Sequence, residues 1–285
     1  MLNTELIPAN LVDELASLAW QCATGAGRLL VDERPKANLA VDVKSTATDV
    51  VTAMDIASEE YIRALISTFR PDDAVLGEEH GSADGTSNIR WVIDPLDGTT
   101  NYLYGLPVWA VSVAAQMRDA DDPIRWHSIV GVVAAPLLGC TWHARIDGPA
   151  FVDDASGRHL LKVGACDELS KALVATGFGY NPARRAEQGS TVAHMASRVR
   201  DLRRMGAASV DLCWVAQGLI DAYWERGLAP WDHAAGELIV AQAGGQVGDL
   251  DGGPAGSAIT VACNSQLWQQ MVDQLQRGDV LGSGI

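Results

Sequence analysis

A chain of 285 residues with 48% hydrophobic residues and a formal net charge of -15 contains enough apolar sequence for a sizeable core. The length allows one large domain or two moderate ones, and the composition is that of a globular chain rather than a disordered one. An acidic surface disfavours direct binding to nucleic acid or anionic lipid, because like charges repel. The densest basic stretch, residues 198–204, is either a binding patch or, as we expect, the solvated face of a helix.

The cysteines and the apolar runs indicate a compartment. None of the five cysteines forms a Cys-x-x-Cys pair, and a dispersed, odd set indicates reduced, mostly buried thiols. The first residues lack the basic and apolar regions of a signal peptide, and the most apolar run, Ile129 to Leu138, is too short to span a bilayer. We therefore expect a soluble cytoplasmic protein.

The first half of the chain begins with two predicted helices and continues with strands. Apolar periodicity predicts an amphipathic helix over residues 10–33 and a second helix that begins near Thr48 or Asp49 and ends before Pro71. The strands expected next are residues 74–77, 90–94, 108–117, 128–135 and 140–146. The first two of these strands end in acidic residues, which draws attention to that end of the predicted sheet.

The second half alternates strands with helices. Strands are expected at residues 172–176, 222–225 and 259–262, and helices at 187–205, 209–219, 232–243 and 266–276. Such alternation implies an α/β (α+β) protein in which layered sheets are covered by helices. A turn-rich stretch from Asp147 to Arg158 predicts a border between sub-domains of residues 1–150 and 151–285, packed together as a single compact unit.

The stretch from Trp91 to Tyr102 is the most informative for chemistry. An apolar strand runs into Asp94, a second acid follows at Asp97, and Gly98 comes next. Two acids three residues apart at a strand end can face one point, and such hard oxygen ligands suit Mg²⁺. Gly98 permits close approach of a phosphate, which the N–H groups of a following helix would favour. Taken alone, the same residues could form a plain surface turn.

Four motifs in order resemble the inositol monophosphatase family, which shares a superfamily with fructose-1,6-bisphosphatase and the phosphoadenosine phosphate phosphatases. They are Asp49-Val-Val-Thr-Ala-Met-Asp55 with Lys44 upstream, Gly77-Glu-Glu79, Asp94-Pro-Leu-Asp-Gly-Thr-Thr-Asn101 and Trp231-Asp-His-Ala-Ala-Gly236. The resemblance covers about residues 10–275 and is far more specific than any single motif. It implies the layered α-β-α-β-α sandwich of the sugar phosphatases.

The resemblance also implies two to three Mg²⁺ ions in each active site. Glu78, Asp94 and the carbonyl of Leu96 would hold the first ion. Asp94, Asp97 and Asp232 would hold the second, so that Asp94 bridges the two. Five clustered acids without cations would repel one another, so they need either metals or raised pKa values.

Further roles follow from the same resemblance. Glu78, with Asp55, would help to hold a weaker third ion, and Thr99, oriented by Asp55, would help to position the attacking water. The backbone N–H groups of Gly98 and Thr99 would hold the phosphate, Ala208 would lie near the substrate, and Glu225 would bond ring hydroxyls.

Each of these residues also has a structural interpretation. Asp55 could lie on a solvated helix face, Glu78 could cap a loop, Asp232 could be a helix N-cap, and Glu225 could be an exposed acid at a strand end. We expect Glu79 to be structural and His233 not to be a ligand. Trp224 departs from the Tyr or Phe that is common in the family, which leaves the shape of the pocket open.

The leading prediction is a phosphoric monoester hydrolase that converts myo-inositol 1-phosphate to inositol and phosphate by metal-activated water. Thr100-Asn101 favours this branch of the superfamily. A broader sugar-phosphate, fructose-1,6-bisphosphate or histidinol-phosphate phosphatase remains an alternative, and a binding protein of a transcription complex is the non-enzymatic alternative. The resemblance further implies a homodimer and sensitivity to lithium.

Overall fold

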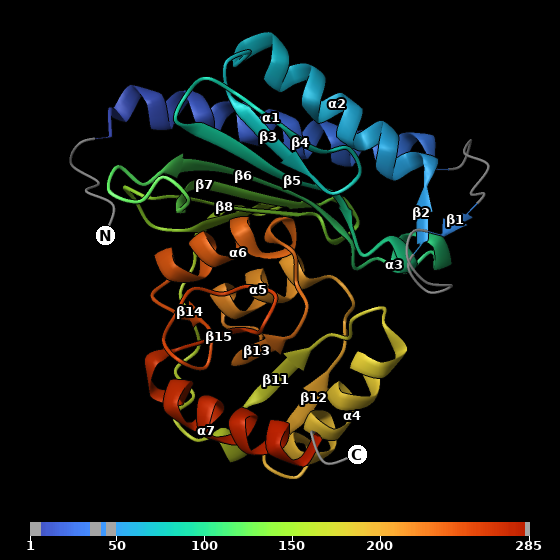
Figure 1. Ribbon diagram of the computed structural model, residues 1–285, viewed down its shortest axis with the longest axis vertical. Helices are drawn as coiled ribbons and strands as arrows, with labels where there is room; N and C mark the ends of the chain where they lie inside the picture. Colours follow the sequence, from blue (N-terminus) through green and yellow to red (C-terminus); the bar gives the residue numbers. More distant parts are fainter. Residues whose placement is uncertain (1–6, 35–40, 44–49, 283–285) are drawn as a thin grey trace.

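The structure is a computed structural model that describes residues 7–34, 41–43 and 50–282, and it consists of stacked layers of helices and sheets (Figure 1). From top to bottom in the figure, the layers are helices α1 (Ala9–Glu33) and α2 (Ala53–Phe69), an eight-stranded sheet, helices α5 (Ala208–Gln217) and α6 (Pro230–Gln242), a five-stranded sheet, and helices α4 (Pro182–Ala196) and α7 (Ser265–Gly282). This order confirms the predicted α-β-α-β-α sandwich.

The first sheet places the acidic strand ends near its edge. Its strands, in spatial order, are β10 (Gly157–Leu160), β9 (Phe151–Asp154), β8 (Cys140–Arg145), β7 (Trp126–Ala135), β6 (Ala110–Arg118), β5 (Ile89–Asp97), β3 (Ala74–Gly77) and β4 (Gly81–Ala83). β3 and β5 are parallel and all other neighbours are antiparallel. Because parallel strands end at the same edge, the acids after β3 and on β5 come together there.

The second sheet is shorter and also mixed. Its order is β12 (Asp201–Arg203), β11 (Leu173–Thr176), β13 (Ala222–Glu225), β15 (Thr260–Cys263) and β14 (Gln246–Gly248), with parallel pairing only between β11 and its two neighbours. The first sheet continues past the predicted border at residue 150, because β9 and β10 belong to it. The division into two sub-domains stays a prediction.

Apolar contacts fill each boundary between layers. Leu15 and Ile62 are buried between the upper helices and the first sheet, and Leu212 and Ile239 are buried between the two sheets. Leu267 packs in the lower cluster against the second sheet. Burial of apolar area therefore fixes the order of the layers, and the layers in turn place the loops at their edges. None of the described helices is long and apolar enough to cross a membrane.

Helix α2 begins later than the sequence analysis placed it. Thr52 is the N-cap of α2, and its hydroxyl oxygen accepts a hydrogen bond of 3.1 Å from the backbone N–H of Met54. The predicted starts at Thr48 and Asp49 were therefore wrong, and these two residues, like Lys44, lie outside the described part of the chain. The preceding residues pair as β2 (Val50–Thr52) with β1 (Val41–Val43), so they cannot be helical.

The predicted helix over residues 187–205 was also wrong at both ends. Asn181 caps α4, with Pro182 at its first turn, and the helix ends at Ala196. The following residues return to pair as β12 with β11 at the edge of the second sheet. The basic stretch at residues 198–204 therefore covers a turn and an edge strand rather than one helix face.

Candidate active site

The segment from Asp94 to Asp97 interrupts the pairing of β5 with β6. The register of the two strands shifts between these acids, which leaves Pro95 and Leu96 in an irregular stretch. Such irregularities re-aim side chains and are common next to active sites. The hydroxyl of Ser58, on α2, donates to the carbonyl of Pro95 at 2.8 Å and holds the irregular stretch in place.

A short helix begins directly after this segment. Gly98 has φ of 90° and is the N-cap of α3 (Thr99–Tyr104), a helix that the sequence analysis considered only as a condition for phosphate binding. A side chain at Gly98 would be strained by this φ, and its Cβ would lie only 3.1 Å from the carbonyl oxygen of Val108. Glycine therefore allows both the turn and the close packing of the backbone at the start of α3.

Asp55 and Thr99 are joined as the sequence analysis expected. The Thr99 hydroxyl lies 2.9 Å from Asp55 Oδ1 and 3.1 Å from the carbonyl oxygen of Leu96. The second oxygen of Asp55 accepts bonds from the backbone N–H of Thr52 at 2.9 Å and from its hydroxyl at 2.6 Å. Both oxygens of this buried carboxylate are therefore engaged in orienting neighbours, which suits a positioning role better than a ligand role.

The carboxylate of Asp97, the last residue of β5, lies at the N-terminus of α5. Its Oδ2 accepts hydrogen bonds from the backbone N–H of Ser209 at 2.7 Å and from the Ser209 hydroxyl at 2.5 Å. Burial raises the pKa of Asp97 to about 6, although the Ser209 bonds oppose that rise. A carboxylate at a helix N-terminus is favoured by the helix dipole, so this contact ties the first sheet to the middle helices.

Asp232 lies in the first turn of α6 and caps its own helix. The backbone N–H of Ala229 donates to Asp232 Oδ2 at 2.7 Å. Burial raises the pKa of Asp232 well above its usual range, and the charges of Glu78 and Asp97 raise it further. Ala229 is the N-cap of α6 and Asp232 is its third residue, so the alternative interpretation of Asp232 as the N-cap is wrong, whereas the charges of Glu78 and Asp97 place Asp232 in the acidic cluster.

Asp94 is the most strongly perturbed member of the cluster. It is 1% exposed, and burial raises its pKa well above the usual range. The neighbouring charges of Glu78, Asp97 and Asp232 raise this pKa further, as does a hydrogen bond with the Glu78 carboxyl group. Two carboxyl groups can share such a bond only when one is protonated. The alternative is that both ionise around a cation, which would remove the repulsion.

The donor set fits a hard divalent cation. Within the described residues, no three or more His, Cys, Asp or Glu side chains already converge as metal ligands. Instead, the carboxylates of Asp94, Asp97 and Asp232 each use one oxygen to accept a bond from a nearby N–H group. The charges of Glu78 and Asp97 raise the pKa values of both Asp94 and Asp232, so these acids lie close together, and a divalent cation among them would remove the repulsion.

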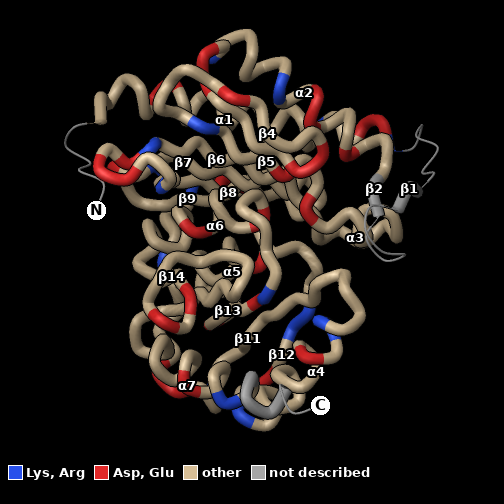
Figure 2. Tube along the Cα trace, viewed as in Figure 1, with Lys and Arg blue, Asp and Glu red and all other residues tan. Residues whose placement is uncertain are grey.

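A cavity of about 300 Å³ opens beside the acids. Its lining includes Asp97, Gly98, Ala208, Glu225 and Asp232, so it brings together predicted metal ligands and predicted substrate contacts from both sheets. Acidic positions lie between β5 and α3, whereas basic positions lie near β12 and α4 (Figure 2). The cavity therefore runs from an acidic end toward a more basic rim.

Glu225 has its own local partners at the substrate end of this cavity. Burial raises the pKa of Glu225 to about 7, while a 2.6 Å hydrogen bond from the Tyr223 hydroxyl and the charge of Arg204 oppose the rise. Gly177 leaves the space that this carboxylate occupies, since a Cβ there would lie 1.8 Å from Glu225 Oε2. Glu225 is half-buried, so it is not the exposed strand-end acid of the alternative interpretation.

The sequence analysis missed several residues around the site. Ser58 and Ser209 hold the loops of Asp94 and Asp97, and Arg204 lines the cavity. Asp211 is buried beneath Glu225, and its Oδ1 finds no hydrogen-bond partner within the described part of the chain. Ser209 and Asp211 are polar residues in an otherwise apolar segment at the start of α5, and this polar type was the available signal.

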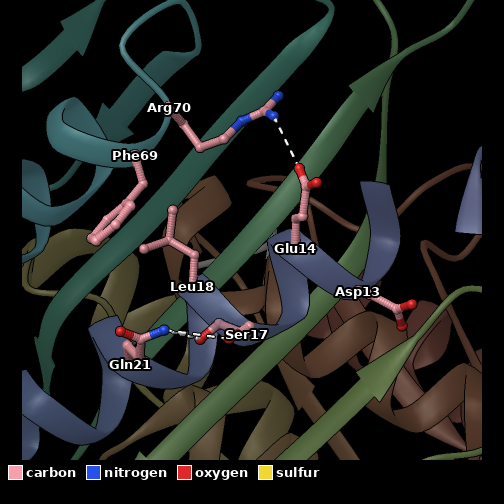
Figure 3. A pocket seen from close by; sticks show the side chains of 7 residues that line it. All are labelled: Asp13, Glu14, Ser17, Leu18, Gln21, Phe69 and Arg70. Carbon is pink, nitrogen blue, oxygen red and sulfur yellow. Dashed lines mark hydrogen bonds and ion pairs between the residues drawn. The ribbon is translucent and has the colours of Figure 1, made fainter. Parts of the chain in front are cut away.

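A second cavity, of about 470 Å³, lies between α1 and the end of α2 and contains none of the predicted site residues (Figure 3). Phe69 and Leu18 form its apolar part, and Arg70 pairs with Glu14 at 3.7 Å across one side. It has no acidic cluster comparable to that around Asp94, so the chemistry is assigned to the first cavity.

His233, beside Asp232, lies 3.1 Å from Glu237, and its exclusion as a ligand stays a prediction.

Comparisons with known proteins agree with this geometry. The profile of the inositol monophosphatase family matches residues 11–278. The "Inositol-1-monophosphatase SuhB" of Mycobacterium tuberculosis is 40% identical over 245 residues, covering 84% of this chain and 82% of that protein. The "Nus factor SuhB" of Pasteurella multocida is 35% identical, covering 93% and 97%. The crystal structure of the extragenic suppressor protein suhB from Bartonella henselae superposes with a TM-score of 0.83 at 33% identity, covering 92% and 98%.

Proposed function

The chain belongs to the inositol monophosphatase family and is a phosphatase, and from this premise we propose that it hydrolyses a small phosphate monoester with the help of Mg²⁺. Myo-inositol 1-phosphate is the first candidate substrate. The observation that supports this most directly is the cluster of Glu78, Asp94, Asp97 and Asp232, in which the charges of Glu78 and Asp97 raise the pKa values of Asp94 and Asp232. The family is generally metal-dependent, and a cation would relieve this repulsion.

The proposed ligands divide between two principal positions. Glu78, Asp94 and the Leu96 carbonyl would hold one Mg²⁺, and Asp94, Asp97 and Asp232 would hold the other. When bound, the ions would acidify a water molecule and neutralise the negative charge on the leaving oxygen. The Leu96 carbonyl oxygen lies 3.1 Å from the Thr99 hydroxyl, and its two lone pairs allow it to serve as a ligand. Glu78 would hold a weaker third ion, and Asp55, whose oxygens accept bonds from Thr52 and Thr99, would help to place it.

The chain's own residues would position the reactants. Asp55 fixes the Thr99 hydroxyl, whose oxygen can then accept a bond from the attacking water. The N–H groups of Gly98 and Thr99, at the start of α3, would donate to the phosphate. Ala208 contributes only a methyl group to the cavity wall and leaves room for a ring, while Glu225 would accept bonds from ring hydroxyls.

Phosphate release from a panel of sugar phosphates, measured with and without Mg²⁺, tests this proposal. We expect release from myo-inositol 1-phosphate that depends on Mg²⁺, together with slower release from fructose 1,6-bisphosphate, histidinol phosphate and other sugar phosphates. If Mg²⁺ produces no release from any compound of the panel, the proposal is wrong. A different preferred substrate would contradict only the choice of inositol phosphate.

A homodimer in the cytoplasm and inhibition by lithium complete the proposal. The apolar strands β6 to β8 give no support for a dimer, because α1 and α6 cover the two faces of this part of the sheet. The remaining support is the family membership and exposed apolar side chains such as Tyr104, at 81%, and Ile124, at 86%.

The described cysteines are all unpaired, in keeping with a reducing compartment. Light scattering tests the homodimer. A comparison of phosphate release in LiCl and in KCl at equal ionic strength tests inhibition by lithium.

A second candidate function is binding within a transcription complex. Two relatives are named Nus factor SuhB, and the one from Pasteurella multocida covers nearly this whole chain. The net charge of -15 disfavours direct binding of RNA. The basic stretch at residues 198–204 does not change this, because Arg203 within it is paired with Asp201 at 2.6 Å. A protein partner is therefore favoured over RNA. Capture of transcription proteins by both the wild type and the Asp94→Asn variant would support this function.

A further inference from the structure

Glu59 is a buried carboxylate that none of the roles above uses. It lies on α2, four residues after Asp55, and its side chain is 0% exposed. Residues three and four apart share one face of a helix, so Asp55, Ser58 and Glu59 form a single polar face. Asp55 contacts Thr99 and Ser58 contacts Pro95, so this face already supports the segment of Asp94 to Thr99 at two points.

Glu59 binds a second segment, the turn that follows β3. Its Oε2 accepts a hydrogen bond of 2.7 Å from the backbone N–H of Glu79, and its Oε1 accepts one of 3.2 Å from the backbone N–H of His80. These two N–H groups immediately follow Glu78 along the chain. On the other side, the backbone N–H of Glu78 donates to the carbonyl of Ile93 on β5 at 3.3 Å. The backbone on both sides of the proposed ligand is therefore held.

The surrounding residues are shaped for this carboxylate. Arg63 donates from Nε to Glu59 Oε1 at 2.7 Å and from Nη2 to the carbonyl of Gly81 at 2.6 Å, so it ties the end of the same turn. Gly77 has no side chain where Glu59 lies, since a Cβ there would be 2.1 Å from Glu59 Oε1. Burying a charge is costly unless it is paired and hydrogen-bonded. Here both oxygens are satisfied by donors of one turn and by the Arg63 that braces it.

We propose that Glu59 is a positioning residue that fixes the turn of Gly77 to His80 and thereby aims the carboxylate of Glu78 at the metal site. This inference rests on the proposed function, because it takes Glu78 to be a metal ligand. The α2 helix then acts as a common support for two segments of the site, the one from Asp94 to Thr99 and the turn after β3. Residues that orient metal ligands typically change metal affinity by about 10- to 100-fold when they are replaced.

The test is direct binding of Mn²⁺ to the purified protein, measured by the paramagnetic resonance signal of the free ion. Glu59→Gln keeps the shape of the side chain but replaces one acceptor oxygen with an N–H₂ donor that faces backbone donors. We expect the dissociation constant for Mn²⁺ to rise about tenfold or more, whereas KM for the substrate at saturating metal changes little. Glu60→Gln, on the exposed neighbour, is the matched control and should bind Mn²⁺ like the wild type.

The outcomes separate the possible explanations. A folded Glu59→Gln protein with wild-type Mn²⁺ binding, even at a lowered melting temperature, would reduce Glu59 to a structural role and overturn the inference. If Glu59→Gln does not fold, Glu59→Asp retains the charge beside Arg63 but withdraws the carboxylate from the turn, and the same criterion applies to it. If the wild type itself binds no Mn²⁺ and releases no phosphate, the proposed function has failed rather than this inference.

Discussion

The two ends of the cavity use acidic residues in opposite ways. At the metal end, Asp94 and Asp232 are surrounded by other acids, and each charge makes its neighbours harder to ionise. At the substrate end, Glu225 is also desolvated, but the Tyr223 hydroxyl and the Arg204 charge favour its ionised form. Burial is common to both ends, and only the partners differ. The metal end therefore needs a cation to ionise fully, whereas at the substrate end protein donors alone limit the rise in the pKa of Glu225 to about 7.

The largest expected effect is at the metal end. Asp94→Asn removes the charge shared by both proposed ion positions while keeping the size of the side chain. We expect turnover to fall by about 10³-fold or more, because the activation of water and the stabilisation of the leaving group fail together. The fold should survive, since a repulsive charge has been removed.

Phosphate release and thermal melting of the purified variant measure these two effects. Asp84→Asn, which changes an exposed acid after β4, is the control and should leave both unchanged. A folded Asp94→Asn protein with near wild-type turnover would show that the acidic end is not the metal end.

A smaller effect is expected at the substrate end. Glu225→Gln removes a charged acceptor, and hydrogen bonds to charged groups contribute about 1.5–3 kcal/mol, so kcat/KM should fall about 10- to 100-fold. The Mg²⁺ concentration for half-maximal activity should stay the same, because Glu225 lies outside the proposed ligand set. A matching shift in the Mg²⁺ dependence would show that the two ends of the cavity are not separate.

The pH dependence of stability sharpens the comparison. Carboxyl groups with raised pKa values bind protons more tightly in the folded protein than in the unfolded chain. Their contribution to the free energy of unfolding therefore declines as the pH rises from the ordinary pKa of each group to its raised pKa. This window runs from pH 3.8 to about 6 for Asp97 and from pH 4.5 to about 7 for Glu225. Without divalent ions, the melting temperature should fall more steeply over this window in the wild type than in Asp94→Asn.

Mg²⁺ distinguishes the two ends in the same experiment. Near pH 7, added Mg²⁺ should raise the melting temperature of the wild type, because ligands that bind only the folded state stabilise it. The contribution of Glu225 should persist when Mg²⁺ is present, since its partners are protein groups. A melting temperature that ignores Mg²⁺ at every pH would contradict the assignment of the acidic end.

The smallest effect concerns the support of Asp55 by the cap of α2. Thr52→Ala removes the N-cap hydroxyl and its bond to Asp55, which should lower the free energy of unfolding by about 1 kcal/mol. Turnover should fall only a few-fold, because the Asp55 bond to Thr99 remains. Urea denaturation measures the change, with Thr68→Ala at the exposed end of α2 as the control. A large loss of turnover would mean that Thr52 acts in the chemistry itself.

Much of the fold could be predicted from the sequence because its signals are local. The apolar periodicity of α1, the capping and glycine signals around α3, and the runs of β5 to β8 each depend on neighbouring residues. Predictions were wrong where pairing with another strand decides the secondary structure. Residues 50–52 pair with 41–43, and Asp201–Arg203 joins the edge of the second sheet, so neither segment continues the helix that its local sequence favours.

The sequence by itself identified Asp94 and Asp97 as site residues, because the order and spacing of their motif are specific. Gly98 follows them because the left-handed backbone at this turn requires glycine. Only the tertiary structure decided how the acids are supported. Ser209 reaches Asp97 from more than a hundred residues away, and Glu59 meets the turn after β3 across the helix-sheet boundary. These contacts leave no local pattern, since a buried polar side chain is identified by its partners, and layer packing alone brings those partners together.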